Sequence, residues 1–117
     1  MNISNALIET TMLGIEDHGI LTTMLHLDLQ DGGCQGFGGY SLDDWDAAKN
    51  RRVGTAFGTE FILRTLDTVG VGSWKDLPGK NIRIKKEGGF GSHIVAIGHI
   101  MEDKWFDPKE LAKEMGL

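Results

Sequence analysis

The residues with the most distinctive chemistry lie in a glycine-rich run, DGGCQGFGGY, at residues 31–40. Glycine is unfavourable inside strands and helices and is kept where the backbone needs a positive φ or must approach another group closely. Phe37 and Tyr40 stand among these glycines, so their rings either pack beneath a neighbouring element or stack on a flat ligand. A shorter run, GGFGS, occupies residues 88–92. The runs indicate either a twisted strand with a packed phenylalanine or a segment that holds a ligand.

Neither run matches a standard phosphate-binding pattern. The glycines of the longer run read GxxGxG and not GxGxxG, and no Gly-Lys-Ser/Thr ending follows them. No strand–helix–strand unit with an acidic residue about 20 positions further on surrounds the run. The sequence therefore argues against a nucleotide hydrolase or a dinucleotide-binding enzyme of either standard design.

Cationic and aromatic side chains near the predicted loops suggest a binding surface. Forked guanidinium groups suit phosphate oxygens, and the free N–H groups of a helix N-terminus also favour anions. Arg51 and Arg52 precede the longest predicted helix. Each such residue alone is more often part of the surface or core, and together they permit a nucleotide-sized pocket without requiring one. The ligand-binding residues predicted on this chemistry are Phe37, Gly38, Tyr40, Arg51, Arg52, Arg64, Phe90, Lys104 and Trp105.

Patterns for metal binding and catalysis are weak. His93 and His99 lie on one face of a predicted strand but about 20 Å apart, too far to share an ion. The chain has a single cysteine, which alone cannot build a thiolate site. Glu16 and Asp17 beside His18 have acid–base chemistry, but these are ordinary turn residues. We therefore predict no catalytic residue, no metal and no cofactor, and a protein that is not an enzyme.

Length and composition narrow the class of protein further. The 117 residues suit a single domain, 1–117, and the formal net charge of −5 argues against binding long nucleic acid. No run approaches the length of a membrane span, and the first residues lack the features of a signal peptide. The lone Cys34 excludes an internal disulfide and fits a reducing cytosol. A cytoplasmic protein without a membrane partner is expected.

The N-terminal half predicts a hairpin followed by a helix. Residues 3–13 and 20–29 read as two strands around a turn at 17–19, because leucines alternate with polar residues in the second strand. Ser41 followed by acidic residues predicts the start of a short polar helix or surface excursion that reaches about Asn50. The main helix is expected over residues 54–69, with Gly70 ending it.

The C-terminal half predicts a second hairpin and a final helix. A helical turn is expected at 73–77, and strands at 81–86 and 93–100. Trp105 and Phe106 precede a helix capped by Asp107, with Pro108 at its first position, so a hydrophobic staple is expected before a helix that closes at Gly116. The predicted fold class is α+β: antiparallel β-hairpins or a small sheet packed with one main helix and a short C-terminal helix.

Several segments taken together carry a resemblance to a known group of proteins. They are TMLGIEDHGI at 11–20, QGFGGY at 35–40, IGHI at 97–100 and DKWFDP at 103–108, with the helix 54–69 and WKDLPGK at 74–80 between them. These segments, spread over almost the whole chain, resemble small phage and prophage proteins, and among them the anti-Thoeris sponge family of phages.

The resemblance implies a specific function. Sponges of this family bind cyclic ADP-ribose isomers made by bacterial TIR-domain immune enzymes and sequester the signal without cleaving it. Some members also bind cyclic oligonucleotides at a separate site, and the family assembles as homodimers and larger oligomers. For this chain the resemblance implies a homo-oligomer in the cytoplasm of an infected bacterial host, with a small cyclic nucleotide as its partner. The predicted binding residues rest on the chemistry above and not on the resemblance.

Two other interpretations remain open. The first is a small phage inhibitor, similar to an anti-CRISPR factor, that docks on a host defence protein and has no small-molecule ligand. In that case an acidic face would imitate nucleic acid or complement a basic groove. Its residues would be Glu16, Asp17, Asp43, Asp44 and Asp46. The second is a small virion or regulatory component without a ligand.

Overall fold

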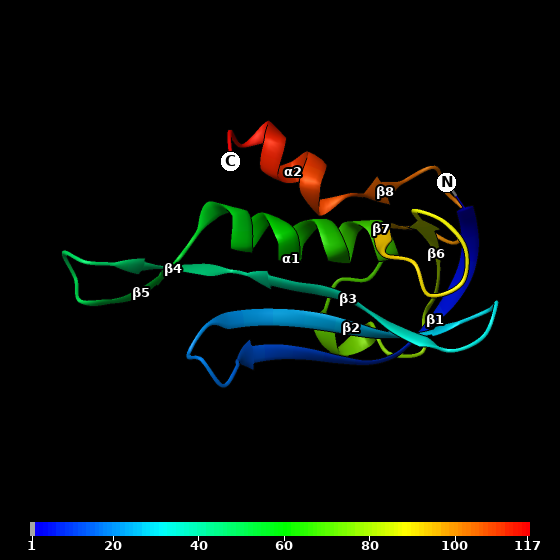
Figure 1. Ribbon diagram of the computed structural model, residues 1–117, viewed down its shortest axis with the longest axis horizontal. Coiled ribbons are helices and arrows are strands. Elements are labelled where there is room, and N and C mark those ends of the chain that lie inside the picture. Colours follow the sequence, from blue (N-terminus) through cyan, green and yellow to red (C-terminus); the bar gives the residue numbers. More distant parts are fainter. Residues whose placement is uncertain (1) are drawn as a thin grey trace.

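Two N-terminal strands form the hairpin that the leucine pattern predicts. The computed structural model describes residues 2–117 (Figure 1). Strand β1 (Asn2–Ile15) pairs antiparallel with β2 (Leu21–Leu29), in a register that runs from Ala6 opposite Leu29 to Ile15 opposite Leu21. Three of the alternate leucines of β2 are buried: Leu25, Leu27 and Leu29. At the turn, the Glu16 carboxylate accepts hydrogen bonds from the backbone N–H groups of His18 and Ile20.

Four more strands extend this hairpin into one antiparallel sheet. They are β3 (Cys34–Ser41), β6 (Asn81–Lys86), β7 (Ile94–Gly98) and β8 (Trp105–Phe106). The order across the six-stranded sheet is β3-β2-β1-β6-β7-β8. The longer glycine-rich run is therefore mostly a strand at one edge of the sheet. The predicted α+β class with antiparallel pairing is confirmed.

Two helices complete the fold. The two caps that the sequence predicts, Gly70 at the end of the first helix and Asp107 at the start of the second, are both present. Helix α1 (Ala56–Val69) begins after Thr55, whose hydroxyl accepts from Gly58 N, and it ends at Gly70 in the left-handed conformation. Helix α2 (Pro108–Glu114) is capped by the Asp107 carboxylate. A 3₁₀ turn, η1 (Trp74–Asp76), lies between α1 and β6. Figure 1 shows α1 running alongside β3, with α2 beyond it.

An aromatic cluster joins the sheet to the helices. Its centre is Phe61 of α1, whose ring centroid lies 5.0 Å from that of Phe106 and 5.6 Å from that of Tyr40. Phe37 stacks on Phe61 at 6.1 Å, and Phe57 completes the group. Such aromatic pairs contribute about 0.5–1.5 kcal/mol each beyond the area they bury. The cluster thus fixes β3, β8 and α1 against one another.

Of the two alternatives predicted after Ser41, a short polar helix or a surface excursion, the structure shows the excursion and not the helix. Residues 43–54 instead form a two-stranded arm, made of β4 (Asp43–Asp46) and β5 (Arg51–Gly54), that projects from the body at the left of Figure 1. The Ser41 hydroxyl, expected to cap a helix, donates to the Asp43 carbonyl at 2.6 Å. Asp43 accepts from Leu21 N and from Arg52. These bonds to distant segments hold the chain extended, where the local pattern favoured a helix.

The remaining differences are smaller. Strand β7 is shorter than the predicted 93–100, and α1 starts at Ala56, two residues later than predicted. Trp105 and Phe106 form strand β8, with Phe106 opposite Ile97. Phe106 and Leu111 hold the two positions of a hydrophobic staple, and both are buried.

Candidate ligand-binding site

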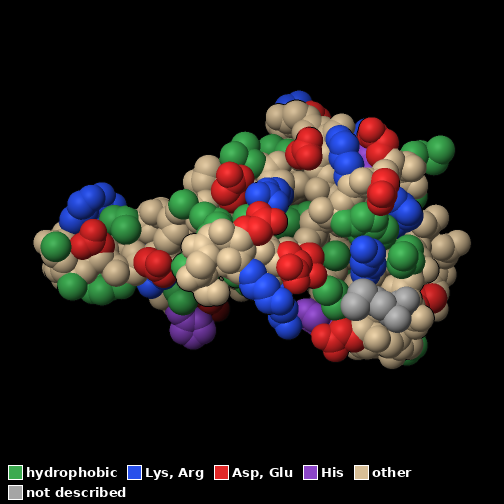
Figure 2. Space-filling view, turned by 90° about the horizontal axis from the view of Figure 1, so that it is seen from above, with side chains coloured by type: hydrophobic (Ala, Val, Ile, Leu, Met, Phe, Trp, Pro, Cys, Tyr) green, Lys and Arg blue, Asp and Glu red, His purple; other side chains and the backbone are tan. Residues whose placement is uncertain are grey.

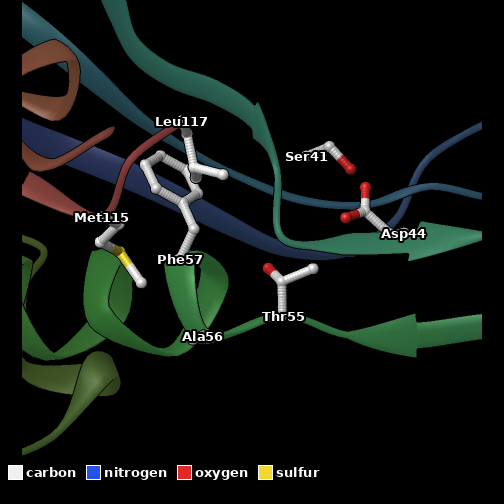
Figure 3. A pocket seen from close by; sticks show the side chains of 7 residues that line it. All are labelled: Ser41, Asp44, Thr55, Ala56, Phe57, Met115 and Leu117. Atoms are coloured by element: carbon white, nitrogen blue, oxygen red, sulfur yellow. The ribbon is translucent and has the colours of Figure 1, made fainter. Parts of the chain in front are cut away.

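A cavity lies where the start of α1, the base of the arm and the C-terminal segment meet. Its volume is about 430 Å³, within the range of roughly 300–1,000 Å³ typical of small-molecule sites. Figure 3 shows apolar side chains on one side of the cavity and polar ones on the other. The lining residues are Ser41, Asp44, Thr55, Ala56, Phe57, Met115 and Leu117.

The apolar side is built from two ends of the chain's helical layer. Phe57 lies in the first turn of α1, and its ring packs 6.1 Å from the rings of Tyr40 and Phe61, so the aromatic cluster holds it from behind. Met115 and Leu117 come from the segment that follows α2. A flat or apolar group in the cavity would therefore contact a ring whose position is already fixed.

The polar side offers hydrogen-bonding groups of different kinds. Asp44 contributes an exposed carboxylate from β4, and Ser41 and Thr55 contribute hydroxyls. The N–H groups of Ala56 and Phe57, at the first positions of α1, have no partner within the helix. Hydroxyl or amino groups of a ligand can donate to Asp44, while an anionic oxygen fits at the helix end, away from that carboxylate.

A close backbone approach brings the two walls of the cavity together. A Cβ atom built on Gly58 would clash with the Leu42 carbonyl oxygen, so only glycine fits at this position. Thr55 N and its hydroxyl both donate to that same carbonyl. Helix α1 therefore begins directly against the junction of β3 and β4, which sets the spacing between Phe57 and Asp44.

An ion pair fixes the base of the arm beside the cavity. Arg52 Nε lies 2.9 Å from Asp43 Oδ2, and its Nη2 donates to Asp43 Oδ1 at 3.0 Å. This hydrogen-bonded pair lowers the pKa of the Asp43 carboxyl and raises the pKa of the Arg52 guanidinium. Arg52 Nη2 also reaches the Ser41 hydroxyl at 3.4 Å. Arg52 thus borders the site, but its charge is already paired with a buried carboxylate.

Only part of the predicted binding set lies near this cavity. Tyr40 and Arg52 adjoin it through Phe57 and Ser41. Phe37 is in the core, and Gly38 lies on β3 opposite Met24. Arg51 is exposed on the arm. Of the two alternatives predicted for the Phe37 ring, packing beneath a neighbouring element or stacking on a ligand, the structure shows packing, against Phe61 and Phe106.

Two other predicted residues share a second, smaller cavity. Arg64 and Trp105 line a hollow of about 330 Å³ together with Lys85. Lys85 Nζ lies 4.1 Å from the Trp105 ring centroid, and Arg64 donates to Glu114 at 3.1 Å. Figure 2 shows basic and acidic side chains interspersed on the face that carries α2. The acids of the cavity, Asp107, Glu110 and Glu114, outnumber its bases.

The last two predicted residues lie elsewhere. Lys104 Nζ is 3.7 Å from Asp67 Oδ1 on the outer side of α1. Phe90 is exposed in the loop between β6 and β7, where its ring lies 5.9 Å from Lys86 Nζ. The structure thus distributes the nine predicted residues over several places and does not gather them in one pocket.

Sequence reasoning missed most of the residues that line the main cavity. Phe57 lies within the predicted main helix, where the sequence gives it no role in binding, and Asp44 is predicted only as part of an acidic face. Met115 and Leu117 carry no local signal. The sequence offered one local sign, a threonine two residues before a phenylalanine at the start of the main helix, which the structure shows to be the cap Thr55 and the half-buried Phe57.

Comparison with known proteins does not identify a family: no protein-family model and no curated protein matches the sequence. Within residues 2–117, no three His, Cys, Asp or Glu side chains are grouped as a metal site would require. Over the same residues, no helix is long and apolar enough to cross a membrane.

Proposed function

We propose that this protein binds a small nucleotide-type signalling molecule, of the cyclic ADP-ribose class, and holds it without cleaving it. The molecule would lie in the main cavity, the one lined by Phe57 and Asp44. The proposal joins the resemblance to anti-Thoeris sponges with the division of the cavity into an aromatic and a polar side. This division is the observation that carries it. A nucleoside needs an apolar surface for its base, hydrogen-bond acceptors for its ribose hydroxyls, and donors for its phosphates.

Each part of such a ligand has a place in the cavity. The base would lie against Phe57, while Asp44 would accept hydrogen bonds from ribose hydroxyls. The phosphate oxygens would lie at the N–H groups that begin α1. Ser41 donates its proton to the Asp43 carbonyl, so its hydroxyl is held by an internal bond and not by a neighbouring base. Sequestration requires only affinity and protein concentration, and no catalytic group.

The test is a thermal-shift and calorimetric titration with cyclic ADP-ribose isomers. Ligand at about 100 times its dissociation constant should stabilise the fold by about 2.7 kcal/mol. The Asp44→Asn variant should weaken binding about tenfold or more, because a charged acceptor contributes more than a neutral one. Phe57→Leu should weaken it as well, by removing the ring. Asp103→Asn, at an exposed aspartate outside the cavity, is the matched control.

Two results would contradict the proposal in different ways. If the ligand recovered after heating is hydrolysed, the protein is an enzyme and not a sponge. If no cyclic nucleotide shifts the melting temperature, or if Asp103→Asn weakens binding as much as Asp44→Asn does, the cavity is not a nucleotide site.

The arm favours a second candidate function, docking on a host defence protein. An isolated two-stranded hairpin is marginally stable in water, yet the arm stands away from the body (Figure 2) and carries an exposed tryptophan, Trp45. The acidic face proposed for this function is partly used internally, since Asp43 is buried against Arg52 and Glu16 holds its own turn. Capture of one specific protein from host lysate, lost in Trp45→Ala, would support this candidate.

A further inference from the structure

The outer face of the β2–β3 ladder carries three side chains with soft metal-binding atoms. The core face of this ladder holds the buried Leu25 and Phe37, which lie opposite each other. Because successive side chains of a strand point to opposite faces, Met24, His26 and Cys34 lie on the other face. His26 and Cys34 are exposed there. Figure 1 shows both helices on one side of these strands.

The strand register brings these three side chains together. In the antiparallel ladder His26 lies opposite Gly36 and Met24 lies opposite Gly38. Cys34 lies two residues before Gly36 on the same strand face, so it is a diagonal neighbour of His26. Side chains directly opposite each other are about 5 Å apart, and diagonal neighbours about 7–8 Å, which long side chains can span. The imidazole and the thiol can therefore reach one atom placed above Gly36.

The Met24 thioether is already directed to this place. A Cβ atom built on Gly36 would lie 2.7 Å from Met24 Sδ, and one built on Gly39 would lie 3.3 Å from Met24 Cε. The methionine side chain thus lies across β3, with its sulfur in the space that a side chain at position 36 would fill. Gly36 is not among the glycines with a positive φ. The absence of a side chain at Gly36 therefore leaves room for the sulfur on the side of the ladder that faces His26.

The His26 ring differs from two other histidine rings of the chain in having no bond within the fold. His18 Nδ1 lies 3.0 Å from the Glu16 carboxylate, and His99 Nδ1 accepts from two backbone N–H groups. The exposed His26 ring makes no hydrogen bond or ion pair with residues 2–117. Its nitrogen lone pair and the free thiol of Cys34 are thus both available to a metal ion.

A thioether, a thiolate and an imidazole together favour Cu(I) over other ions. Soft sulfur ligands select Cu(I), whereas carboxylates and water suit hard cations. Zinc sites are built from cysteine, histidine and carboxylate ligands, so zinc would use Asp28, opposite Cys34 on the same face, in place of Met24. Within residues 2–117 no three His, Cys, Asp or Glu side chains are grouped for a metal, which leaves the methionine set as the alternative.

We propose that Met24, His26 and Cys34 form a Cu(I) site on the outer face of β2 and β3. The Cys34 thiol releases its proton when the Cu–S bond forms, so that the thiolate neutralises the charge of the ion. Met24 Sδ and one His26 ring nitrogen bind as neutral ligands. The exposed His26 and Cys34 side chains rotate toward the methionine sulfur, and the ladder itself does not move. None of the three residues lines the main cavity.

The experiment is an anaerobic titration in which the full chain competes for Cu(I) with the chromophoric chelator bicinchoninate. Wild type is expected to withdraw an equimolar amount of copper. Met24→Leu and His26→Gln should each weaken binding about tenfold or more, since even the outer-shell partners of metal ligands contribute that much. Met101→Leu is the matched control, because Met101 is 83% exposed away from this face, and it should bind as wild type does. Asp28→Asn should also leave the affinity unchanged.

A second variant tests the position of the sulfur without removing a ligand. The Cβ of Gly36→Ala would meet the flexible end of Met24 and no backbone atom, so this variant should fold and yet displace the sulfur. It should therefore weaken Cu(I) binding as Met24→Leu does. Gly89→Ala, which meets no atom within 4 Å, should bind as wild type does. Circular dichroism and melting establish that both variants are folded.

Four results would each overturn the proposal. The first is a wild type that takes no copper from the chelator. The second is wild-type affinity in Met24→Leu or His26→Gln, which would mean that Cys34 holds the ion alone. The third is a larger loss in Asp28→Asn than in Met24→Leu. The fourth is wild-type affinity in a folded Gly36→Ala. None of these results depends on whether a nucleotide binds.

Discussion

The two Gly-Phe-Gly runs lie beside each other in the structure, but the phenylalanine is buried in one run and exposed in the other. Gln35 of the first run donates to the Ser92 carbonyl of the second at 2.9 Å. Phe37 is only 4% exposed and packs between α1 and β8, whereas Phe90 is 76% exposed. Identical tripeptides, GFG at 36–38 and at 89–91, thus supply a core residue in one place and a surface ring in the other.

The difference follows from what lies across from each run. The first run forms β3, in which Phe37 pairs with Leu25 and faces Phe61. The second run forms the turn between β6 and β7, where Ser92 N donates to Gly89 O and no helix covers the ring. A phenylalanine among glycines therefore says little about ligand binding until the layer above it is known.

The largest expected effect contrasts the two rings. Phe37→Ala should lower the free energy of unfolding by about 3–5 kcal/mol, because it leaves a cavity inside the aromatic cluster. Phe90→Ala should change it by less than about 0.5 kcal/mol. Denaturant unfolding of both variants measures this. Similar losses would mean that Phe90 is buried in solution, and the two rings would not differ.

Substitution of the glycines next to these rings should show the same contrast, with a larger loss of stability in the first run than in the second. A Cβ on Gly38 would lie 2.5 Å from the Thr23 carbonyl oxygen, and φ there is +124°. Gly38→Ala should therefore destabilise the fold by about 1–3 kcal/mol. Gly89→Ala meets no atom within 4 Å and should be close to neutral. Melting temperatures of the two variants test this contrast. If Gly38→Ala melts at the same temperature as the unchanged protein, β3 can shift its register at this position.

A buried lysine connects the two runs. The side chain of Lys86 is 2% exposed, and its Nζ lies 3.4 Å from Asp31 Oδ2 at the start of the first run. Asp31→Asn should reduce stability by about 1 kcal/mol, since it weakens the acceptor for a buried charge. Asp28→Asn, an exposed aspartate on β2, is the control. Equal unfolding midpoints for the two variants would show that Asp31 does not stabilise the buried Lys86 charge.

The smallest expected effect concerns Tyr40, which ends the first run. Burial, with a smaller contribution from the Asp107 charge, raises the pKa of the Tyr40 hydroxyl above 10. The unfolded chain therefore loses this proton first, so stability is full below pH 10 and falls as the pH rises above it. Tyr40→Phe should have a flatter stability profile between pH 9 and about 11. Parallel profiles for the two proteins would contradict this assignment.

Local sequence was sufficient for the elements whose ends and faces depend on neighbouring residues. Alternating leucines specify β2, the αL glycine at position 70 ends α1, and the Asp107–Pro108 pair starts α2. These signals act over a few residues, through side-chain alternation and through caps that satisfy free N–H groups. The α+β class follows from them.

Contacts between distant segments decided the rest. The arm exists because Asp43 pairs with Arg52 and accepts from Leu21, bonds that outweigh a plausible helix start. The residues that line the cavity come from the β3–β4 junction, the start of α1 and the end of the chain. Because these segments are distant in the sequence, no local motif could predict the cavity. Which rings are buried and which hollow remains open depends on how the layers pack, and packing is a property of the assembled fold.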